Sequence, residues 1–266
     1  MDQRLERLLD LFRQHGPVAV AFSGGVDSTL TLWAAARALD GKALGVSIRS
    51  EFICRAEHER AERMAAFLAE AVGARVAVCG VSVLEHARLR SNPPDRCYLC
   101  KQLVLAQVRA EARAAYGEDF RLADGTNADD DPARPGLRAV AEAGALSPLA
   151  LCGIDKAGVR ELARQLGLPN AEDPSNSCLA TRVPTGSELT FARLTAIEGM
   201  ERAARDLGLV DLRARLVPGP LDGQEGDAVR LLVRPGQLVF AQSLATRLEE
   251  RARFIGFTHF ALGERT

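Results

Sequence analysis

The sequence predicts an α/β fold: a parallel sheet with helices on both faces, followed by a small C-terminal α+β domain. Two observations lead to this prediction. In the first part of the chain, continuous apolar runs, typical of strands buried on both faces, alternate with amphipathic stretches. Such alternation favours right-handed crossovers and a parallel sheet. After about Leu168 the alternation stops, and a stretch rich in Pro, Ser and Asn precedes shorter elements.

The elements of the first part follow one another in regular order. Apolar residues at i, i+3, i+4 and i+7 indicate a first helix over 5–12. The other elements expected here are strands over 18–22, 43–48, 75–81 and 120–123, and helices over 29–39, 55–72 and 101–116. Polar loops, SGGVDS and DGTNADDD, follow the first and last of these strands. Ligands bind beyond the carboxyl ends of parallel strands, so both loops are candidates for a site.

The C-terminal part predicts a small α+β domain. We expect helices over 190–207 and 242–254, and strands over 212–217, 228–233 and 257–262, with a Pro/Gly-rich link between the first two strands. The preceding stretch, PNAEDPSNSCLATRVPTGSE, is typical of a functional loop or hinge. The expected organisation is a first domain over 1–170, a mobile Cys-bearing loop over 171–189 and a small domain over 190–266.

Composition excludes several classes of protein. The 266 residues are 47% hydrophobic and 26% charged, as in globular proteins. The net charge of −1 offers no general basic excess for nucleic acid. No apolar run reaches the roughly 18 residues of a membrane span, and the charged N-terminal stretch does not resemble a signal peptide. We therefore expect a cytoplasmic protein with six reduced cysteines that binds neither nucleic acid nor membrane.

The SGGVDS loop is the first candidate site. It consists of Ser23, Gly24, Gly25, Val26, Asp27 and Ser28. Two glycines allow a tight turn that exposes backbone N–H groups, and the following helix N-terminus favours anions. Asp27 can hold Mg²⁺ or tie down the loop. The pattern is neither a Walker loop nor a dinucleotide fingerprint. Pyrophosphate binding is favoured over a plain Gly-rich turn.

SGGVDS resembles the PP-loop of the ATP pyrophosphatase superfamily. That resemblance implies a PP-loop sheet domain, of the adenine nucleotide alpha hydrolase-like kind, over 1–170. It also implies ATP cleavage between the α and β phosphates, with AMP placed on a substrate oxygen. By the same resemblance, the second loop lies beside the nucleotide, with Gly125, Thr126, Asn127 and Asp129 as binding residues. From the residues alone, this loop is equally a solvated acidic turn.

Three cysteines stand in stretches of functional character. Cys97 and Cys100 form a CxxC after a Pro-rich turn, which can be a redox pair, half of a metal site or two packing residues. No thioredoxin-like setting and no second zinc-binding pair is present. Cys178 is either a thiolate nucleophile, favoured by Arg182 four residues on, or an unremarkable loop thiol. Together the three thiols are an incomplete shell for a [4Fe-4S] cluster with one open iron.

The four motifs SGGVDS, NPPDRCYLCK, DGTNADD and SCLATR, in this order, closely resemble the LarE family over residues 10–220. The resemblance implies an ATP-dependent sulfur transferase, forming AMP and pyrophosphate, that helps build the nickel-pincer nucleotide cofactor. The implied substrate is a pyridinium mononucleotide bearing carboxylates. One carboxylate is adenylated, and a sulfur nucleophile displaces AMP. The implied cofactor is ATP with Mg²⁺, and the implied assembly is a homo-oligomer.

The family resemblance implies two alternative sulfur sources. In single-cysteine members, the residue matching Cys178 attacks the acyl-adenylate and then loses its sulfur, which leaves dehydroalanine. In members with three cysteines, a [4Fe-4S] cluster on residues matching Cys97, Cys100 and Cys178 carries an extra sulfide. This sequence has all three, which favours the cluster.

Further residues match the family one by one. Lys101 would neutralise a phosphate or the acyl-adenylate, unless it is a solvated helix lysine. Arg182 follows the CLA element, and Glu201 resembles an acid of the preceding helix. Arg213 and Arg215 alternate on one strand and resemble a pair that meets the substrate phosphate, against the alternative of a solvated edge. One departure is that the acid common in relatives near Leu232 is absent.

Two other functions remain as alternatives. A PP-loop tRNA thiolation enzyme would use similar cysteine chemistry, but it needs a basic RNA-binding surface that the net charge disfavours. A non-catalytic ATP-binding module would need none of the cysteine motifs. The small C-terminal domain is expected to bind the substrate or to form the oligomer contact.

Overall fold

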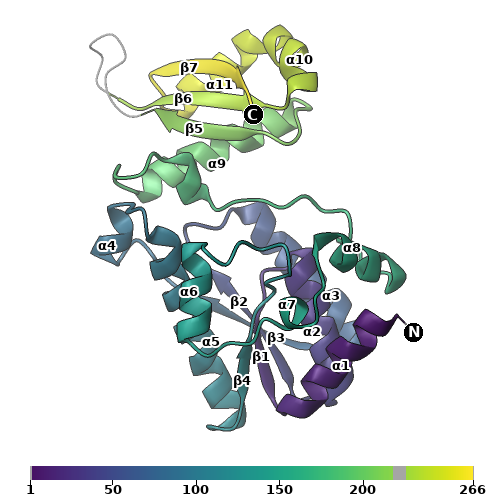
Figure 1. The fold of residues 1–266 in the computed structure, drawn as a ribbon. Coiled ribbons are helices and arrows are strands. Elements are labelled where there is room, and N and C mark those ends of the chain that lie inside the picture. The colour runs from purple at the N-terminus through teal and green to yellow at the C-terminus, as the bar shows by residue number, and fades with distance from the viewer. Residues whose placement is uncertain (1, 218–225, 266) are drawn as a thin grey trace. The chain divides into compact units, whose positions relative to one another are not determined.

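The computed structural model describes residues 2–217 and 226–265, which form two compact units (Figure 1). The first unit contains the chain up to Val81 together with Asp95–Asn176. The second contains Ser82–Pro94 and the chain from Ser177 onward. Most of the link expected between the strands of the small domain, residues 218–225, lies outside the described residues.

The first unit is built on a parallel sheet, which confirms the predicted fold class. The strand order is β3-β2-β1-β4. The strands are β1 (Val18–Ala21), β2 (Ala43–Arg49), β3 (Arg75–Gly80) and β4 (Arg121–Ala123). Strand β1 pairs with β2 on one side and with β4 on the other, so the strand order reverses direction at β1. The crevice beyond the carboxyl ends of β1 and β4 is where such folds bind ligands.

Helices cover both faces of this sheet (Figure 1). Val18 and Val20 of β1 pack with residues of the helices on one face, while Ala19 packs with α5 on the other, which explains the unbroken apolar run. The helices of the unit are α1 (Gln3–His15), α2 (Val26–Leu39), α3 (Arg55–Val72), α5 (Arg96–Tyr116), α6 (Pro135–Glu142), α7 (Pro148–Leu151) and α8 (Lys156–Gln165). Of these, α6, α7 and α8 were not predicted.

The second unit has a three-stranded sheet. Its strands are β5 (Arg213–Val217), β6 (Ala228–Val233) and β7 (His259–Glu264), in that spatial order. Strands β5 and β6 are antiparallel, whereas β6 and β7 are parallel. The unit also has the helices α4 (Ala87–Arg90), α9 (Phe191–Asp206), α10 (Leu238–Ser243) and α11 (Ala245–Ile255), and the 3₁₀ turns η1 (Leu179–Arg182) and η2 (Pro235–Gln237). No helix among the described residues is long and apolar enough to cross a membrane.

Two helices differ from their predicted bounds. The helix predicted over 242–254 is two helices, because the backbone leaves helical geometry at Leu244. Helix α5 begins at Arg96 rather than at Lys101, so the CxxC lies in its first turn.

Residues 82–94 pack with the second unit although they precede α5 of the first. The Asn92 side chain, which is buried, donates hydrogen bonds to the carbonyls of Val183 and Pro184 at 3.1 and 2.8 Å. The Asn92 carbonyl accepts from Gly186 N at 2.8 Å. These contacts join segments about 90 residues apart in sequence, and no local pattern predicts them.

All six cysteines lie in the described part of the chain, and none forms a disulfide. Burial, followed by a hydrogen bond to Glu111, raises the pKa of the Cys79 thiol. Burial also raises the pKa of Cys152. Both thiols therefore stay protonated at neutral pH, as expected of packing residues.

A glycine fixes the position of the first loop. Gly24 has a positive φ of 71°, and a Cβ at this position would lie 2.5 Å from Cα of Ala61 in α3. Backbone atoms cannot yield as a flexible side chain can. The loop after β1 therefore lies directly on the α3 backbone.

We expect Gly24→Ala to destabilise the protein by about 2–4 kcal/mol, because the methyl group meets backbone and the residue must keep a left-handed conformation. Gly41→Ala is the matched control, since Gly41 also has a positive φ but open space around it. Urea unfolding measures both variants. Equal losses of stability would mean that contact with α3 does not constrain the loop.

Candidate active site

Hydrogen bonds of Ser23 and Ser28 stabilise the loop after β1. Ser23 N donates to Ser28 Oγ at 3.2 Å, and this hydroxyl donates in turn to the Gly25 carbonyl at 3.1 Å. Gly25 is the N-cap of α2 and makes no side-chain capping bond. The N-terminus of a helix of this length therefore faces the loop without a capping side chain, which suits an anion.

The loop after β4 lies against the first loop. A Cβ at Gly125 would lie 2.8 Å from Ser28 N, so only glycine allows this approach. The buried Asp124 carboxylate shapes the second loop by accepting hydrogen bonds from Thr126 N, Thr126 Oγ1 and Ser147 Oγ at 3.1, 2.7 and 3.0 Å. The structure thus brings together the two loops predicted to form a nucleotide site.

Asp27 connects the two loops to the start of helix α8. Its Oδ1 accepts a hydrogen bond from Asn127 Nδ2 at 3.2 Å, and its Oδ2 pairs with Lys156 Nζ at 2.5 Å. The backbone N–H of Lys156 donates to Asp129 Oδ2 at 2.9 Å. Sequence reasoning did not predict Lys156 as a site residue. The available signal was that lysine is rare here, with only Lys42, Lys101 and Lys156 in the chain.

The predicted Mg²⁺ ligand was Asp27. Mg²⁺ in phosphate sites takes one or two carboxylates and completes its shell with waters and phosphate oxygens. The Asp27 carboxylate already binds a cation, the Lys156 ammonium, beside the helix N-terminus. Its chemistry therefore fits a metal that arrives with a nucleotide. The described residues contain no group of three or more metal-ligating side chains that would hold an ion without one.

Asn170 reaches the first loop from far along the chain. It is 1% exposed, and its Nδ2 donates to the Gly24 carbonyl and to Thr29 Oγ1, both at 2.9 Å. Its Oδ1 has no hydrogen-bond partner within the described residues. Asn170 therefore also stabilises this loop. Sequence reasoning did not identify it as a site residue.

The CxxC lies at the start of α5. Cys97 is exposed and Cys100 is half-buried. Tyr98, between them, donates to Glu142 at 2.6 Å and stacks with Arg138, which fixes this turn on α6. Lys101 Nζ lies 4.0 Å from Asp124 Oδ2 of the second loop, so its ammonium faces the candidate site. This contact distinguishes Lys101 from a solvated helix lysine.

Cys178 belongs to the second unit, as N-cap of η1. Arg182 Nη1 donates to the carbonyls of Ser177 and Cys178 at 2.7 and 3.1 Å. The Arg182 side chain is buried and forms an ion pair with Glu201, with 3.0 Å between Nε and Oε1. Glu201 Oε1 also accepts from Ala214 N of β5 at 3.1 Å. Both residues thus hold the Cys178 turn on the sheet, and neither is exposed to a ligand in this arrangement.

The residues predicted for an iron–sulfur cluster lie in different units. Cys97 and Cys100 are in the first unit, and Cys178 is in the second. Across the described ranges, no three Cys, His, Asp or Glu side chains gather as metal ligands. Within the described residues, neither unit by itself supplies all three of the predicted ligands.

Arginines share one face of the small sheet. Arg213 and Arg215 alternate along β5, and Arg230 of β6 lies opposite Arg215 in the register. Burial, followed by the charges of Arg182 and Arg265, lowers the pKa of Arg213. Within the described part of the chain, Arg215 and Arg230 make no ion pair. Leu232 lies opposite Arg213 and offers no compensating charge.

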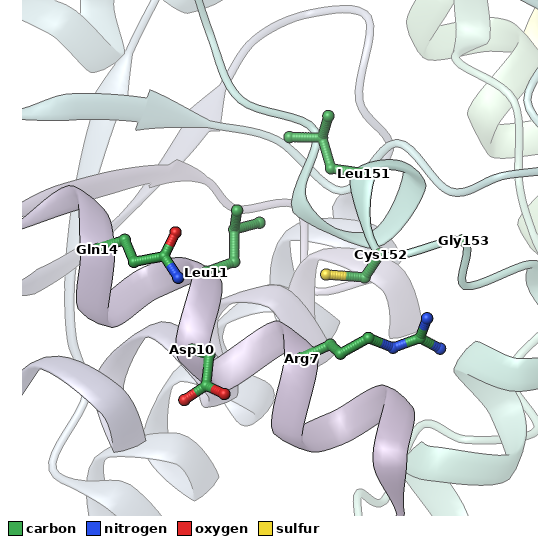
Figure 2. Close-up of a pocket in the computed structure, with 7 residues that line it drawn as sticks. All are labelled: Arg7, Asp10, Leu11, Gln14, Leu151, Cys152 and Gly153. Atoms are coloured by element: carbon green, nitrogen blue, oxygen red, sulfur yellow. The ribbon is translucent and has the colours of Figure 1, made fainter.

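A separate pocket lies between α1 and the turn after α7 (Figure 2). Its volume is about 560 Å³, and it is lined by Arg7, Asp10, Leu11, Gln14, Leu151, Cys152 and Gly153. None of these residues belongs to the two loops. The pocket is therefore separate from the candidate site at the two loops.

Comparison with known proteins gives three relatives. The chain is 34% identical over 199 residues to the pyridinium-3,5-bisthiocarboxylic acid mononucleotide synthase of Lactiplantibacillus plantarum, which covers 74% of this chain and 70% of that protein. It is 32% identical over 216 residues to an uncharacterized protein of Synechocystis sp., covering 81% and 78% of the two chains. An uncharacterized Methanocaldococcus jannaschii protein is 29% identical over 199 residues, covering 74% and 73%. No protein-family model matches the chain.

The buried Arg182–Glu201 pair gives a prediction about stability. Glu201→Ala should destabilise the protein by about 3–5 kcal/mol, because it leaves the Arg182 charge buried without its partner. Glu249→Ala, which removes an exposed partner of Arg253, is the control and should cost about 0–1 kcal/mol. Denaturant unfolding compares the two variants. A loss of the same small size at both sites would show that the buried pair does not hold the turn.

Proposed function

The chain belongs to the LarE family, and from this we propose that it is an ATP-dependent sulfur transferase in nickel-pincer cofactor synthesis. Its substrate would be a pyridinium mononucleotide bearing carboxylates. The relative from Lactiplantibacillus plantarum carries the name of a bisthiocarboxylic acid mononucleotide synthase, which supports this substrate class. The observation that carries the proposal is the close approach of Gly125 to Ser28, which joins the SGGVDS loop to the second loop at the carboxyl edge of the sheet.

Adenylation is the first proposed step. A carboxylate oxygen of the substrate attacks the α-phosphorus of ATP, and the bond to the bridging oxygen of the β-phosphate breaks. Pyrophosphate leaves, and an acyl-adenylate forms. The uncapped N-terminus of α2 and the Ser23–Ser28 loop would bind the departing pyrophosphate. Asp27 would hold Mg²⁺, which would supply charge neutralisation on the phosphates when bound.

Sulfur transfer is the second proposed step. The Cys178 thiolate attacks the acyl carbon and expels AMP, which gives a thioester. Removal of the Cys178 α-proton then breaks the Cβ–S bond, so the substrate keeps sulfur as a thiocarboxylate and the protein keeps dehydroalanine. The Arg182 hydrogen bonds to the Ser177 and Cys178 carbonyls would position this turn.

The cluster on Cys97, Cys100 and Cys178 stays a prediction. A bound cluster would supply sulfide from its open iron. Cys178 is the N-cap of η1, in a turn whose carbonyls Arg182 binds, and we propose this thiol as the sulfur donor. In this proposal Cys97, which is exposed, and Cys100, which is half-buried, take no part in the sulfur transfer. They lie beside Lys101 at the start of α5.

We expect one turnover to lower the mass of the wild-type protein by one H₂S. Cys178→Ser should still release pyrophosphate from ATP and the carboxylated nucleotide, because adenylation does not need the thiol, but it should form no thiocarboxylate. Cys97→Ser is the discriminating control and should retain single-turnover product. Intact-mass spectrometry, pyrophosphate release and iron content of anaerobically purified protein measure these outcomes.

Other results would redirect the proposal. Stoichiometric iron, an unchanged protein mass and loss of product in Cys97→Ser would make the cluster the sulfur source. ATP binding without AMP formation would indicate a non-catalytic module. Thiolation of tRNA, with no turnover of the pyridinium nucleotide, would support the tRNA alternative.

The arginine face of the small sheet would bind the substrate phosphate. Arg215 and Arg230 lie opposite each other on neighbouring strands and are exposed. Cross-strand neighbours are close enough for both guanidiniums to reach one phosphate. Arg213 lies on the same face and is half-buried.

Arg215→Ala or Arg230→Ala should raise the KM for the mononucleotide by about 10–100-fold, the effect of losing one charge-assisted hydrogen bond. Arg234→Ala, an exposed arginine just beyond β6, is the control and should leave KM unchanged. Because each protein molecule transfers one sulfur, KM is measured as the substrate concentration that gives half of the maximal single-turnover rate of pyrophosphate release. The dephosphorylated nucleoside should remove the difference between variants and wild type. An equal loss with the nucleoside would argue against phosphate binding.

A further inference from the structure

The turn over residues 170–173, called the anchored turn below, lies just before the stretch of chain that leads to Cys178. Its first residue, Asn170, is buried and donates a hydrogen bond to the Gly24 carbonyl at 2.9 Å. Asp173 N donates to the Asn170 carbonyl at 3.2 Å, which closes the turn. The SGGVDS loop and the chain leading to Cys178 are therefore both attached to this turn.

Arg160 of α8 binds the backbone of the anchored turn. Its Nη1 donates to the Ala171 carbonyl at 2.7 Å, and its Nη2 donates to the Asp173 carbonyl at 3.0 Å. A guanidinium is planar and rigid, so two bonds to carbonyls two residues apart fix the direction in which the chain leaves the turn.

Helix α8 gives Arg160 a rigid base. Val159 and Leu162 are fully buried in the core that also contains residues of α2. The N-cap residue Asp155 accepts a hydrogen bond from Gly158 N at 2.7 Å, which stabilises the start of the helix. Arg160 therefore connects the anchored turn to the core of the first unit.

The chain between the anchored turn and Cys178 is short. Residues 174–177 form no helix or strand, and the chain enters the second unit after Asn176. From residue 173 to residue 178 the chain reaches at most about 18 Å. If the turn detached, the tether would begin at the buried Leu168 and be twice as long. The local concentration of a tethered group falls roughly as the −3/2 power of tether length, which gives about a threefold loss.

From these contacts, we propose that Arg160 is a positioning residue for sulfur transfer. It holds the base of the chain that carries Cys178, so that the thiolate, rather than water, attacks the acyl-adenylate. In the competing hydrolysis, water attacks the acyl carbon, expels AMP and restores the substrate carboxylate. This inference rests on the proposed function, because it requires Cys178 as the sulfur donor.

The test measures two products of one reaction of the full-length protein with ATP and the carboxylated nucleotide. Pyrophosphate release reports adenylation, and thiocarboxylate formed per pyrophosphate reports transfer. Arg160→Ala should lower this ratio by about threefold or more, because the tether lengthens. Its initial rate of pyrophosphate release should match wild type, because Asn170 holds the SGGVDS loop through bonds of its own.

Arg164→Ala is the matched control, with the same change in net charge one turn further along α8. Within the described residues, Arg164 donates to the Glu172 carboxylate at 2.7 Å and to no carbonyl of the anchored turn. This variant should keep the wild-type ratio of products. Arg160→Lys keeps the charge but replaces the planar fork with one ammonium, so its ratio should lie between those of wild type and Arg160→Ala.

Two results would overturn the inference. One is a wild-type ratio of thiocarboxylate to pyrophosphate in both Arg160 variants. The other is an equal loss of pyrophosphate release and of thiocarboxylate, because a merely structural residue would weaken both steps alike. Either result leaves the proposed function standing as long as the wild-type protein forms thiocarboxylate.

Melting temperatures within a few degrees of wild type establish that each variant is folded. If Arg160→Ala does not fold, Arg160→Lys carries the test, and a wild-type ratio in that variant alone overturns the inference. Absence of pyrophosphate release from the wild-type protein would instead contradict the proposed function together with this inference.

Discussion

The close approach of two backbone loops is the constraint on which the candidate site depends. Gly125 lies on the backbone of Ser28, and Gly24 lies on the backbone of Ala61, so neither position accepts a side chain. Both loops leave the carboxyl edge of neighbouring strands, where the order of the parallel sheet reverses. This packing brings the N-terminus of α2, Asp27 and the second loop to one place, and the lysines at this edge add positive charge.

The second unit relies on a buried charge pair. Burying Arg182 with Glu201 is costly unless the remaining polar atoms are satisfied, and here they bind the Ser177 carbonyl and Ala214 N. The sequence indicated Arg182 as a site residue because it follows the CLA element four residues after Cys178, and Glu201 because it resembles an acid of the family. Their burial supports a role in positioning the cysteine turn. The exposed arginines of the neighbouring sheet face are better suited to meet a phosphate.

Periodicity and turn residues predicted most of the fold. The helix over 55–72 and the strand over 228–233 have the predicted bounds, and the two loops meet as their strand ends implied. The features that the sequence did not predict depend on contacts between residues far apart in the chain. Lys156 and Asp27 are 129 positions apart, Asn170 and Gly24 are 146 apart, and residues 82–94 join the second unit through Asn92. Local propensity carries no information about such pairs. Likewise, only the strand register places Arg230 opposite Arg215.

The central claim is that the substrate carboxylate is activated as an acyl-adenylate before sulfur enters. A substrate carboxylate labelled with a heavy oxygen isotope tests this most directly. One labelled oxygen should appear in the phosphate of AMP for each thiocarboxylate formed, because the carboxylate oxygen attacks the α-phosphorus and leaves with it. AMP without the label, alongside thiocarboxylate product, would contradict the account.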